Sequence, residues 1–343
     1  MTDVLRGGGV LGRGAAVVGC EATVIGHDFG FLSRMLRVAL TYDRAAPGVP
    51  RTVVVKLEPD AGEYRAFGDE LHAFAREIRF YREVAAVVPL RLPRLYHGAL
   101  DGECGVLVME DLGFASPGDQ LAGLHADQVI ATVRLIGRLQ GRFWDNAGLA
   151  ALDWMPLSNH VEVDYDGKWP SLVEHFGAAI GPAGLALGAR LLGGGSAWVE
   201  TEIARRPRTI VHADLRADNL LFGPPGSPDE VLVVDWQLAI RSMGAFDVAR
   251  LVGGSELPAE RRGHAFAALR TWHDALRESG VDDYADADAL RDFRLGALAL
   301  LSYPVHFHTG VIGRPGRAHA LTEVVCRRVF AAAVDVDAAA ILP

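Results

Sequence analysis

Lysine is almost absent from this chain of 343 residues, because only Lys56 and Lys168 are lysine among its 34 basic residues and the rest are arginine. The ammonium group of lysine is a compact point charge, whereas the guanidinium of arginine is a wide planar fork. The two therefore do not replace each other where one cation must touch phosphate oxygens in a narrow site. Lys56 ends the apolar run VVVK and is a candidate phosphate-binding residue. An exposed strand lysine is the alternative, and the scarcity of lysine argues against it.

Cysteine and long apolar runs are also scarce. The three cysteines, Cys20, Cys104 and Cys326, are widely spaced and form no C-x-x-C pair, so no disulfide framework or zinc site is indicated and we expect buried thiols. No run approaches the ~18 uncharged apolar residues of a membrane span, and the N-terminus lacks an apolar signal segment. The sequence predicts a cytoplasmic protein with no membrane partner.

Positive charge is in deficit. The chain has 43 acidic and 34 basic residues and a formal net charge of -9, whereas a nucleic-acid surface needs a basic stripe, so we expect no nucleic-acid partner. A hydrophobic content of 50% with 22% charged residues is ordinary for a globular protein, and the length allows two lobes. Net acidity is compatible with a cationic substrate.

Two short apolar runs in the middle of the chain end in polar side chains. Asp214 and Asn219 follow the run 210–211, and Asp235 follows the run 231–234. The spacing from Asp214 to Asn219 is that of the H-R-D-x-x-x-x-N catalytic loop, and Asp235 stands where the D-F-G aspartate follows the next strand. A hydroxyl that attacks the terminal phosphate of ATP must lose its proton to a carboxylate, and Mg²⁺ prefers oxygen ligands. The pattern predicts Asp214 as the base and Asn219 and Asp235 as magnesium ligands.

Neighbouring residues have weaker signals. Arg216 stands two residues after Asp214, where kinases carry a basic residue that stabilises charge on the transferred phosphate, so it is a candidate catalytic residue; a surface arginine is the alternative. We expect His212 to order the loop, Asp218 to be exposed or to cap a turn, and Asp247 to accept backbone N–H bonds or to cap its own helix.

The first lobe is predicted to begin with strands. Residues 21–43 indicate two strands joined by a turn that Gly26 and Gly30 bracket, and glycine there lets backbone N–H groups approach nucleotide phosphates. An ordinary hairpin turn is the alternative reading of this G-x-x-x-G. Residues 51–58 indicate a third strand, which carries Lys56. Residues 1–20 are glycine-rich and patternless, and we expect a loose lead-in.

A helix is predicted from about Glu63 to Val87, because apolar residues recur there at helical spacing. Glu77 lies on the edge of this apolar stripe, where the Lys–Glu ion pair of kinases needs its acid, so we expect it to pair with Lys56. Glu70, on the same edge, is the competing candidate. Residues 94–112 then indicate two strands around a turn at 101–102.

The second lobe is predicted to be mainly helical. Helices are expected in the segment 129–143 and, near the C-terminus, over 258–279, 287–303 and 317–334. A group of residues at a proline break could wall a substrate pocket: Tyr303, His306, Phe307 and His308. The acidic patch Glu162, Asp164 and Asp166 is expected to be a solvated loop.

Three stretches resemble a known family: VHADLRADNLLF at 211–222, VVDWQ at 233–237 and GAFDVARL at 244–251. They resemble the aminoglycoside phosphotransferase and choline kinase group, and the DWQ variant looks most like its ecdysteroid kinase-like branch. That branch usually reads HGD, so Ala213 is a small departure. The resemblance covers the chain from about Glu21 to Gly254. It implies an α+β protein kinase-like fold, with a small β-sheet lobe carrying one long helix (1–112) and a larger helical lobe with the catalytic loop and substrate site (113–343).

The resemblance also implies where the nucleotide binds. In that group the strand that ends at Glu110 leads into the hinge, whose backbone contacts adenine, so Glu110 and Leu112 join Gly26, Gly30, Lys56 and Glu77 as candidate nucleotide-binding residues. For the acidic side chains at 110 and 111, a solvated strand end is the alternative.

The predicted reaction transfers the γ-phosphate of ATP, with Mg²⁺, to a hydroxyl group of a small metabolite or antibiotic. The chain lacks the A-P-E element and an activation segment after Asp235, which argues against a protein substrate. Two alternatives remain: a catalytically silent nucleotide-binding protein of the same fold, and a metal-dependent phosphoesterase using His212, Asp214 and Asp235. The acceptor, the preference for ATP or GTP, and a monomeric or homodimeric state stay open.

Overall fold

The computed structural model describes residues 1–26, 33–45, 47–59, 62–101, 104–159 and 163–343, and the chain divides into two compact units. The first unit comprises Met1–Ser116 together with Leu232–Leu238, and the second comprises Pro117–Val231 and Ala239–Pro343. The first unit therefore extends four residues beyond 112, the expected end of the first lobe, and it also takes in the short segment that carries Asp235.

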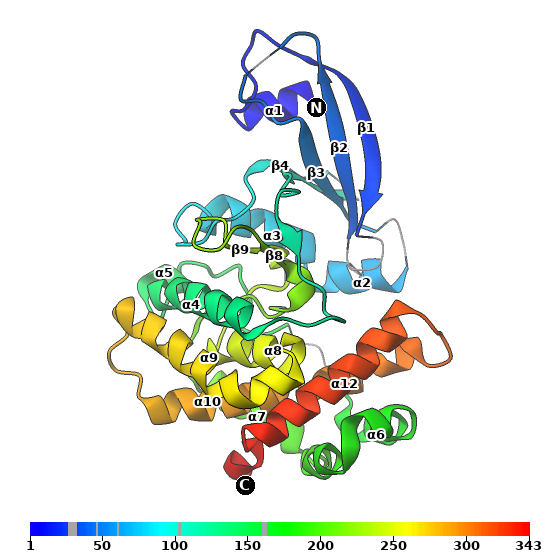
Figure 1. Cartoon of the computed structure of the whole chain (residues 1–343), viewed down its shortest axis with the longest axis vertical. Coiled ribbons are helices and arrows are strands. Elements are labelled where there is room, and N and C mark those ends of the chain that lie inside the picture. Colours follow the sequence, from blue (N-terminus) through cyan, green and yellow to red (C-terminus); the bar gives the residue numbers. More distant parts are fainter. Residues whose placement is uncertain (27–32, 46, 60–61, 102–103, 160–162) are drawn as a thin grey trace. The chain divides into compact units, whose positions relative to one another are not determined.

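The first unit is built on a five-stranded antiparallel sheet in the order β1-β2-β3-β5-β4 (Figure 1). Its strands are β1 (Val17–Ile25), β2 (Arg34–Tyr42), β3 (Thr52–Leu57), β4 (Leu95–Asp101) and β5 (Cys104–Glu110). The central strand β3 is a run of β-branched residues, which suit a strand that is paired on both edges. Lys56 lies opposite Met35 and Leu107 in this register. The predicted strands are confirmed.

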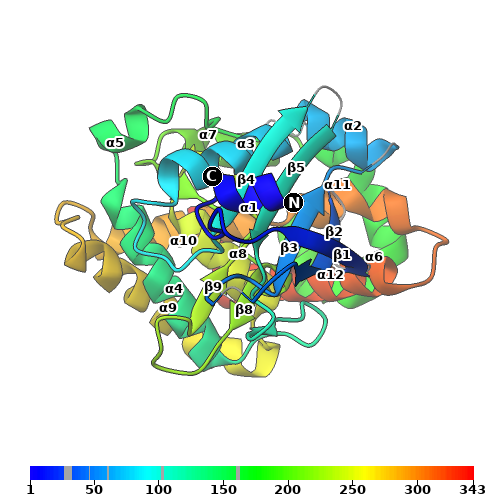
Figure 2. The same ribbon diagram turned by 90° about the horizontal axis from the view of Figure 1, so that it is seen from above.

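The N-terminal segment is not a loose lead-in, so that expectation was wrong. Residues Thr2–Gly7 form the helix α1, which contacts β4 (Figure 2). Leu5 is fully buried, and it joins Leu11, Val38 and Val53 in one apolar cluster on the sheet. Burial of these few apolar side chains orders a segment for which the glycine content predicted no regular structure.

The single helix predicted over 63–87 is broken into three pieces: α2 (Glu63–Glu70), α3 (Ala73–Arg79) and a π-helical turn, η1 (Phe80–Val84). The break lies at His72, which has a φ of 51° in the left-handed region. After the break, α3 approaches the sheet closely, because Gly105 and Gly98 leave room for the side chains of Phe74 and Ile78. Apolar spacing alone cannot reveal such a change of direction.

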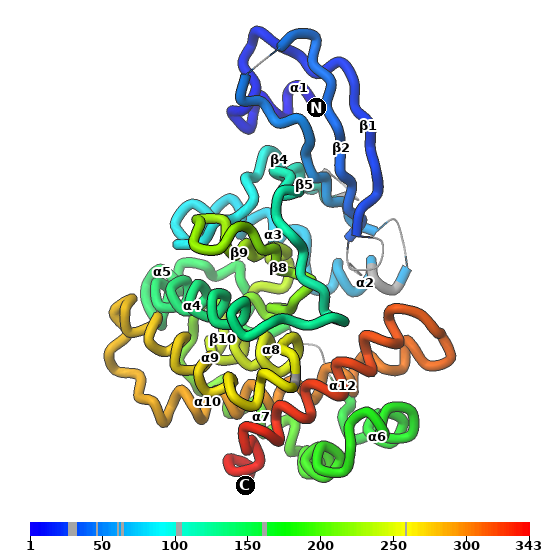
Figure 3. Tube along the Cα trace, viewed as in Figure 1, coloured from blue at the N-terminus to red at the C-terminus, as the bar shows by residue number. Residues whose placement is uncertain are grey.

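The second unit is mainly helical (Figures 1 and 3). Its helices are α4 (Ala126–Arg142), α5 (Ala147–Ala150), α6 (Tyr165–Ala189), α7 (Gly195–Ala204), α8 (Ala245–Ser255), α9 (Pro258–Glu278), α10 (Asp286–Ala299), α11 (Ser302–Phe307) and α12 (Arg317–Asp335). Packing pairs α4 with α9, α8 with α10 and α12 with α6. The predicted helices 129–143, 258–279, 287–303 and 317–334 are confirmed in position.

Short strands and turns carry the motif residues. The strands are β6 (Ser116–Pro117), β7 (Thr209–Val211), β8 (Leu220–Phe222), β9 (Val231–Val233) and β10 (Ile240–Ser242), and the 3₁₀ turns are η2 (Ala217–Asn219), η3 (Trp236–Leu238), η4 (His308–Val311) and η5 (Ala338–Ile341). β7 pairs with β10 in an antiparallel register that sets Val211 opposite Ile240. The loop that follows β7 therefore begins from a fixed, buried strand.

α6 contains charged residues, so it is not an uncharged apolar run of the kind that the sequence lacks. Among the described residues it is a helix long and apolar enough to span a membrane by length and composition, with 39% of the relevant window buried. The helix contains Pro170 and Pro182, is kinked at Gly181, and packs against α12 (Figure 3). Core helices of soluble proteins pass the same test, so α6 alone assigns no membrane span.

The cysteines are only partly as expected. Cys326 in α12 is buried, and burial raises the pKa of its thiol to about 12. Cys20 is exposed, so the expectation of a buried thiol was wrong there. Cys20 lies on β1, an edge strand whose residues are mostly exposed.

Candidate active site

The first unit brings together three polar residues that are far apart in sequence. Lys56 on β3 donates through Nζ to Glu77 Oε2 on α3 at 2.6 Å and to Asp235 Oδ1, two residues after β9, also at 2.6 Å. Lys56 and Glu77 are only 2% and 1% exposed. The expected pairing of Lys56 with Glu77 is confirmed, and Asp235 joins it.

The electrostatics of this cluster favour an additional cation. Burial lowers the pKa of Lys56, but the adjacent carboxylates of Asp235 and Glu77 raise it by more, so the ammonium group stays charged at neutral pH. Burial raises the pKa of Glu77, and the charge of Lys56 opposes that shift. The cluster therefore contains one ammonium group for two carboxyl groups. The side chain of Asp235 is 23% exposed, so it remains accessible to a positive ion.

An aromatic stack holds the segment that carries Asp235. Trp236 is fully buried, and its ring stacks on Phe80 at 4.1 Å with an interplanar angle of 7°. Phe80 begins the π-helical turn, a type of turn that is frequent at functional sites. Asp235 itself has a φ of 68°, which is unusual for a residue other than glycine and must be maintained by its surroundings.

The π-helical turn also contributes Tyr81, which the sequence indicated only as part of an apolar stripe. Its side chain is buried beside the Lys56 cluster, and burial together with the charges of Glu77 and Asp235 raises the pKa of its hydroxyl well above the usual value. The Tyr81 hydroxyl and Glu77 Oε1 both lack a hydrogen-bond partner. Two such atoms beside Lys56 leave a donor and an acceptor for a bound group or water.

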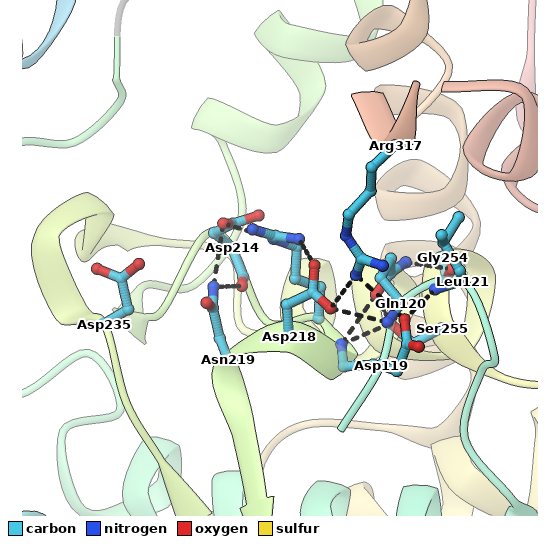
Figure 4. Close-up of polar contacts among 12 residues, drawn as sticks. Asp119, Gln120, Leu121, Asp214, Asp218, Asn219, Asp235, Gly254, Ser255 and Arg317 are labelled. Carbon is cyan, nitrogen blue, oxygen red and sulfur yellow. Dashed lines mark hydrogen bonds and ion pairs between the residues drawn. The ribbon is translucent and has the colours of Figure 1, made fainter. Parts of the chain in front are cut away.

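The second unit holds the loop that follows β7, where both carboxylate oxygens of Asp214 accept hydrogen bonds. Figure 4 shows Asp214 beside Asn219. Oδ1 accepts from Arg250 Nη2 at 2.9 Å, and Oδ2 accepts from Arg216 Nε and from Asn219 Nδ2, each at 3.1 Å. Asn219 Nδ2 also donates to the carbonyl of Asp214 at 2.8 Å. The amide nitrogen of Asn219 is thus committed to the loop, which leaves its carbonyl oxygen as the group that can ligate a hard cation.

Two arginines keep Asp214 ionised. Burial alone would raise its pKa, but the charges of Arg216 and Arg250 lower it below the usual value. A carboxylate with a low pKa is a weak base. It suits phosphoryl transfer, because the loose transition state needs the attacking hydroxyl to be oriented more than it needs early removal of the proton.

Asp247 holds the backbone of the loop, which confirms one of its two predicted roles. It is 1% exposed and accepts from the backbone N–H groups of His212 at 2.8 Å and Ala213 at 3.0 Å. Burial raises its pKa to about 7. Ala213 has a φ of 65°, the left-handed region that favours glycine, which explains why the resembling loops read HGD and why alanine departs from them at a cost.

Two residues pack around the Asp214 loop in a way that the sequence did not predict: Tyr303, which was expected only as a pocket wall, and Arg250. Tyr303 on α11 donates through its hydroxyl to the carbonyl of Ala213 at 3.2 Å, and its ring lies 4.7 Å from the guanidinium carbon of Arg250. Burial raises the pKa of Tyr303 to about 12, so the hydroxyl stays a donor. The sequence could have indicated Arg250, because it lies three residues after Asp247 in the same helix and therefore on the same helix face as Asp247.

Arg216 is not a surface arginine. It is 8% exposed and binds Asp218 as well as Asp214. Asp218 is not exposed either, since its side chain is 1% accessible; it accepts from the backbone N–H of Gln120 at 2.8 Å and lies 3.5 Å from Arg317 Nη2 (Figure 4). Of the two predicted roles of Asp218, exposure was therefore wrong, because charged side chains from three parts of the chain meet there. Its bond to the backbone N–H of Gln120, a turn residue, fits the other role, the capping of a turn.

The remaining candidates stand as follows. Gly26 has a φ of 68° with open space where a side chain would be, and Gly30 lies outside the described residues. The carboxylate of Glu110 accepts from Arg91 Nη2 at 2.6 Å and from the backbone N–H of Arg94 at 3.0 Å, so it is committed to structure. Leu112 is 6% exposed. Any role of positions 110 and 112 in binding adenine thus falls to the backbone.

The oxygen donors fit magnesium. Mg²⁺ in phosphotransferases is held by one or two protein carboxylates together with substrate phosphates and water, not by a closed protein cage. Asp235 offers a partly exposed carboxylate, and Asn219 offers its carbonyl oxygen. In the part of the chain that the structure describes, no group of three or more His, Cys, Asp or Glu side chains gathers to hold a metal.

Comparison with known proteins agrees with these observations. The profile of the phosphotransferase enzyme family, APH, matches residues 37–293, so the chain belongs to that family. No curated protein matches the chain in sequence. The family match does not distinguish the ecdysteroid kinase-like branch.

Several solved structures share the fold. A protein of Ralstonia eutropha JMP134 described as a candidate aminoglycoside phosphotransferase has a TM-score of 0.54 at 14% identity, covering 95% of each chain. A microcompartment-associated aminopropanol kinase has a TM-score of 0.54 at 14% identity and covers 92% of this chain and 91% of its own. The GDP complex of aminoglycoside 2'-phosphotransferase-IIIa has a TM-score of 0.52 at 13% identity, with coverages of 92% and 93%. The fold is the protein kinase-like α+β fold of these phosphotransferases.

Proposed function

We propose that this phosphotransferase is a small-molecule kinase that transfers the γ-phosphoryl group of ATP to a hydroxyl group. The observation that supports this most directly is the contact of Lys56 Nζ with both Glu77 and Asp235. A buried lysine between two carboxylates is the arrangement that kinases use to hold nucleotide phosphates and the metal-binding aspartate in place. A hydrolase acting on a phosphate ester has no need of it.

Each residue has a definite role in this proposal. Lys56 binds phosphate oxygens and is oriented by Glu77. Asp235 and Asn219 are the magnesium ligands, and the ion neutralises charge on the phosphates when it is bound. Asp214 accepts the hydrogen bond of the acceptor hydroxyl. As the acceptor oxygen bonds to the γ-phosphorus, the bond from that phosphorus to the oxygen of ADP breaks and the hydroxyl proton passes to the Asp214 carboxylate.

Arg216 and the hinge complete the proposal. Arg216 holds Asp214 through Oδ2, and its charge favours the phosphoryl group in transfer. The backbone at positions 110 and 112 binds the nucleotide base. A related fold binds GDP, so the choice between ATP and GTP is part of the test. We also propose a cytoplasmic location, membership of the ecdysteroid kinase-like branch, and no nucleic-acid or membrane partner.

The test is a screen of hydroxylated small molecules for consumption of ATP or GTP, followed by mass detection of a phosphorylated product. The proposal expects Asp214→Ala to abolish turnover while nucleotide binding, measured by calorimetry, is retained. Nucleotide binding with no turnover for any acceptor would favour a silent nucleotide-binding protein. Hydrolysis of phosphate esters that survives Lys56→Ala would favour a metal-dependent phosphoesterase.

A further inference from the structure

We propose that the acceptor is a hydroxyl compound with a planar apolar body and a negatively charged group, and that it binds to a surface formed by Lys168, Tyr303, His306 and Phe307. This inference rests on the proposed kinase function. We call these four residues the Lys168 surface. It lies wholly in the second unit, on α6 and α11.

Lys168 is one of the chain's two lysines, and it lies in the first turn of α6. Its Nζ donates to the carbonyl of His306 at 3.3 Å, and it makes no ion pair with any carboxylate of the described residues. The nearby acids are otherwise engaged: Asp164 accepts from the backbone N–H of Gly167, and Asp166 accepts from that of Gly193. Lys168 is thus a partly exposed ammonium group that forms no ion pair with the carboxylates of the described residues.

Two histidines, His306 and His308, lie near Lys168, and two more lie on neighbouring elements. Four of the twelve in the chain lie on the facing parts of α6, α11, η4 and α12: His175, His306, His308 and His319. Burial, together with the nearby charge of Lys168, lowers the pKa of both His306 and His308, so these rings are neutral at physiological pH. His306 Nδ1 is buried and has no hydrogen-bond partner. A lysine beside neutral imidazoles that forms no ion pair within the described residues can bind an anion.

Aromatic rings connect Lys168 to the catalytic loop. Tyr303 contacts the carbonyl of Ala213 next to the proposed base, and its ring centroid lies 6.4 Å from that of Phe307. Phe307 is 49% exposed, and its ring meets that of His306 edge-on at 4.5 Å. An exposed phenylalanine beside a reactive loop offers an apolar contact for the body of a ligand. Of the four residues expected to wall a substrate pocket, His308 is fully buried, and Tyr303, His306 and Phe307 form this surface.

The carboxylates that surround the loop are already paired, which disfavours a cationic acceptor. Asp214 is bound by Arg216 and Arg250, and Asp218 is bound by Arg216. Arg317 also binds Asp218, and it binds Asp119 at 3.1 Å (Figure 4). An amine that entered would lose its hydration without gaining a free carboxylate in return.

The experiment compares acceptors that differ only in charge: 4-(hydroxymethyl)benzoate, 4-(hydroxymethyl)benzylamine and the neutral 4-methylbenzyl alcohol, each with a biphenyl homologue of greater length. The readout is kcat/KM for phosphorylation by the full chain. We expect the acid to exceed the amine by about tenfold or more, the value of one charge-assisted contact. Lys168→Met should remove that preference through KM and leave the neutral alcohol unchanged, and Lys168→Glu should reverse it. Arg190→Met, which removes a cation from the far end of α6, is the matched control and should change nothing.

A binding measurement keeps the inference separable from the proposed function. In the presence of a non-hydrolysable ATP analogue, the acids should raise the melting temperature of the wild-type chain and not that of Lys168→Met. Preference for the amines, equal use of acid and amine, or binding of the acids that is unaffected by Lys168→Met overturns the proposed acceptor class. Binding of the acids through Lys168 with no phosphorylation of any alcohol supports the surface and contradicts the kinase function instead.

Discussion

Arg250→Met separates the stability of the second unit from the orientation of Asp214. Arg250 is 6% exposed, its Nη2 donates to Asp214 Oδ1 at 2.9 Å, and its guanidinium lies over the ring of Tyr303. Its Nε and Nη1 atoms are buried without a hydrogen-bond partner. Methionine fills a similar volume and carries neither the charge nor these donors.

The magnitudes nearly cancel for folding. Losing the charge-assisted bond to Asp214 costs about 1.5–3 kcal/mol, and losing the cation–π contact costs about 0.5–2 kcal/mol. Removing the two buried donors that lack a partner stabilises the folded state by about 1–3 kcal/mol for each donor. We therefore expect the free energy of unfolding of Arg250→Met to lie within about 2 kcal/mol of the wild-type value. Asp214 loses the partner of one oxygen, so kcat should fall by about 10- to 100-fold, with KM for ATP unchanged.

The assays are denaturant unfolding and steady-state phosphorylation of an acceptor found in the screen. Arg261→Met is the control, because Arg261 is buried on α9 and pairs with Asp335 at 2.6 Å, away from the loop. It should lower stability and leave kcat unchanged. If Arg250→Met unfolds several kcal/mol more easily while kcat is preserved, Arg250 is structural and our account of Asp214 is wrong.

Three further predictions follow from the same contacts. Glu77→Gln leaves Lys56 bound to Asp235, so we expect kcat/KM for ATP to fall about 10- to 100-fold with the fold retained by circular dichroism; an unchanged value would remove Glu77 from the site. Asp247→Asn should lower stability by about 1–3 kcal/mol. Because the pKa of Asp247 is raised to about 7, the folded state holds a proton that the unfolded state has released between pH 4 and 7. The free energy of unfolding of the wild-type chain therefore falls as pH rises from about 4 to 7. The difference in unfolding free energy between wild type and Asp247→Asn should therefore narrow between pH 5 and 8, and a widening gap would show the opposite ionisation. Ala213→Gly should change stability by less than about 1 kcal/mol, since relief of strain offsets lost burial, whereas Ala213→Val at the same positive φ should cost well over 1 kcal/mol by thermal unfolding; equal effects would exclude backbone strain.

The sequence was informative where chemistry restricts residue type and spacing together. The interval from Asp214 to Asn219 predicted a pair that the structure joins by hydrogen bonds, and the rarity of lysine pointed to Lys56, which contacts Glu77 and Asp235. Strands and long helices were also predictable, because their apolar periodicity reflects burial on one face.

Contacts between distant elements were not predictable in the same way. Arg250 and Tyr303 lie on α8 and α11, and only the packing of the second unit places one over the other beside Asp214. The helix break at His72 likewise depends on how α3 packs against the sheet, and the helical structure of the N-terminal segment depends on how α1 packs there. A one-dimensional pattern does not contain these distances.

The most direct measurement follows the γ-phosphoryl group itself. ATP labelled in that group is incubated with the chain, Mg²⁺ and an accepted alcohol, and the label is traced to the alcohol, to water or to neither. Our account predicts that the label appears in the phosphorylated alcohol, and that Asp214→Asn slows this transfer by about 10²- to 10⁴-fold while nucleotide affinity is kept. Label released only as inorganic phosphate, or transfer that persists undiminished in Asp214→Asn, would contradict it.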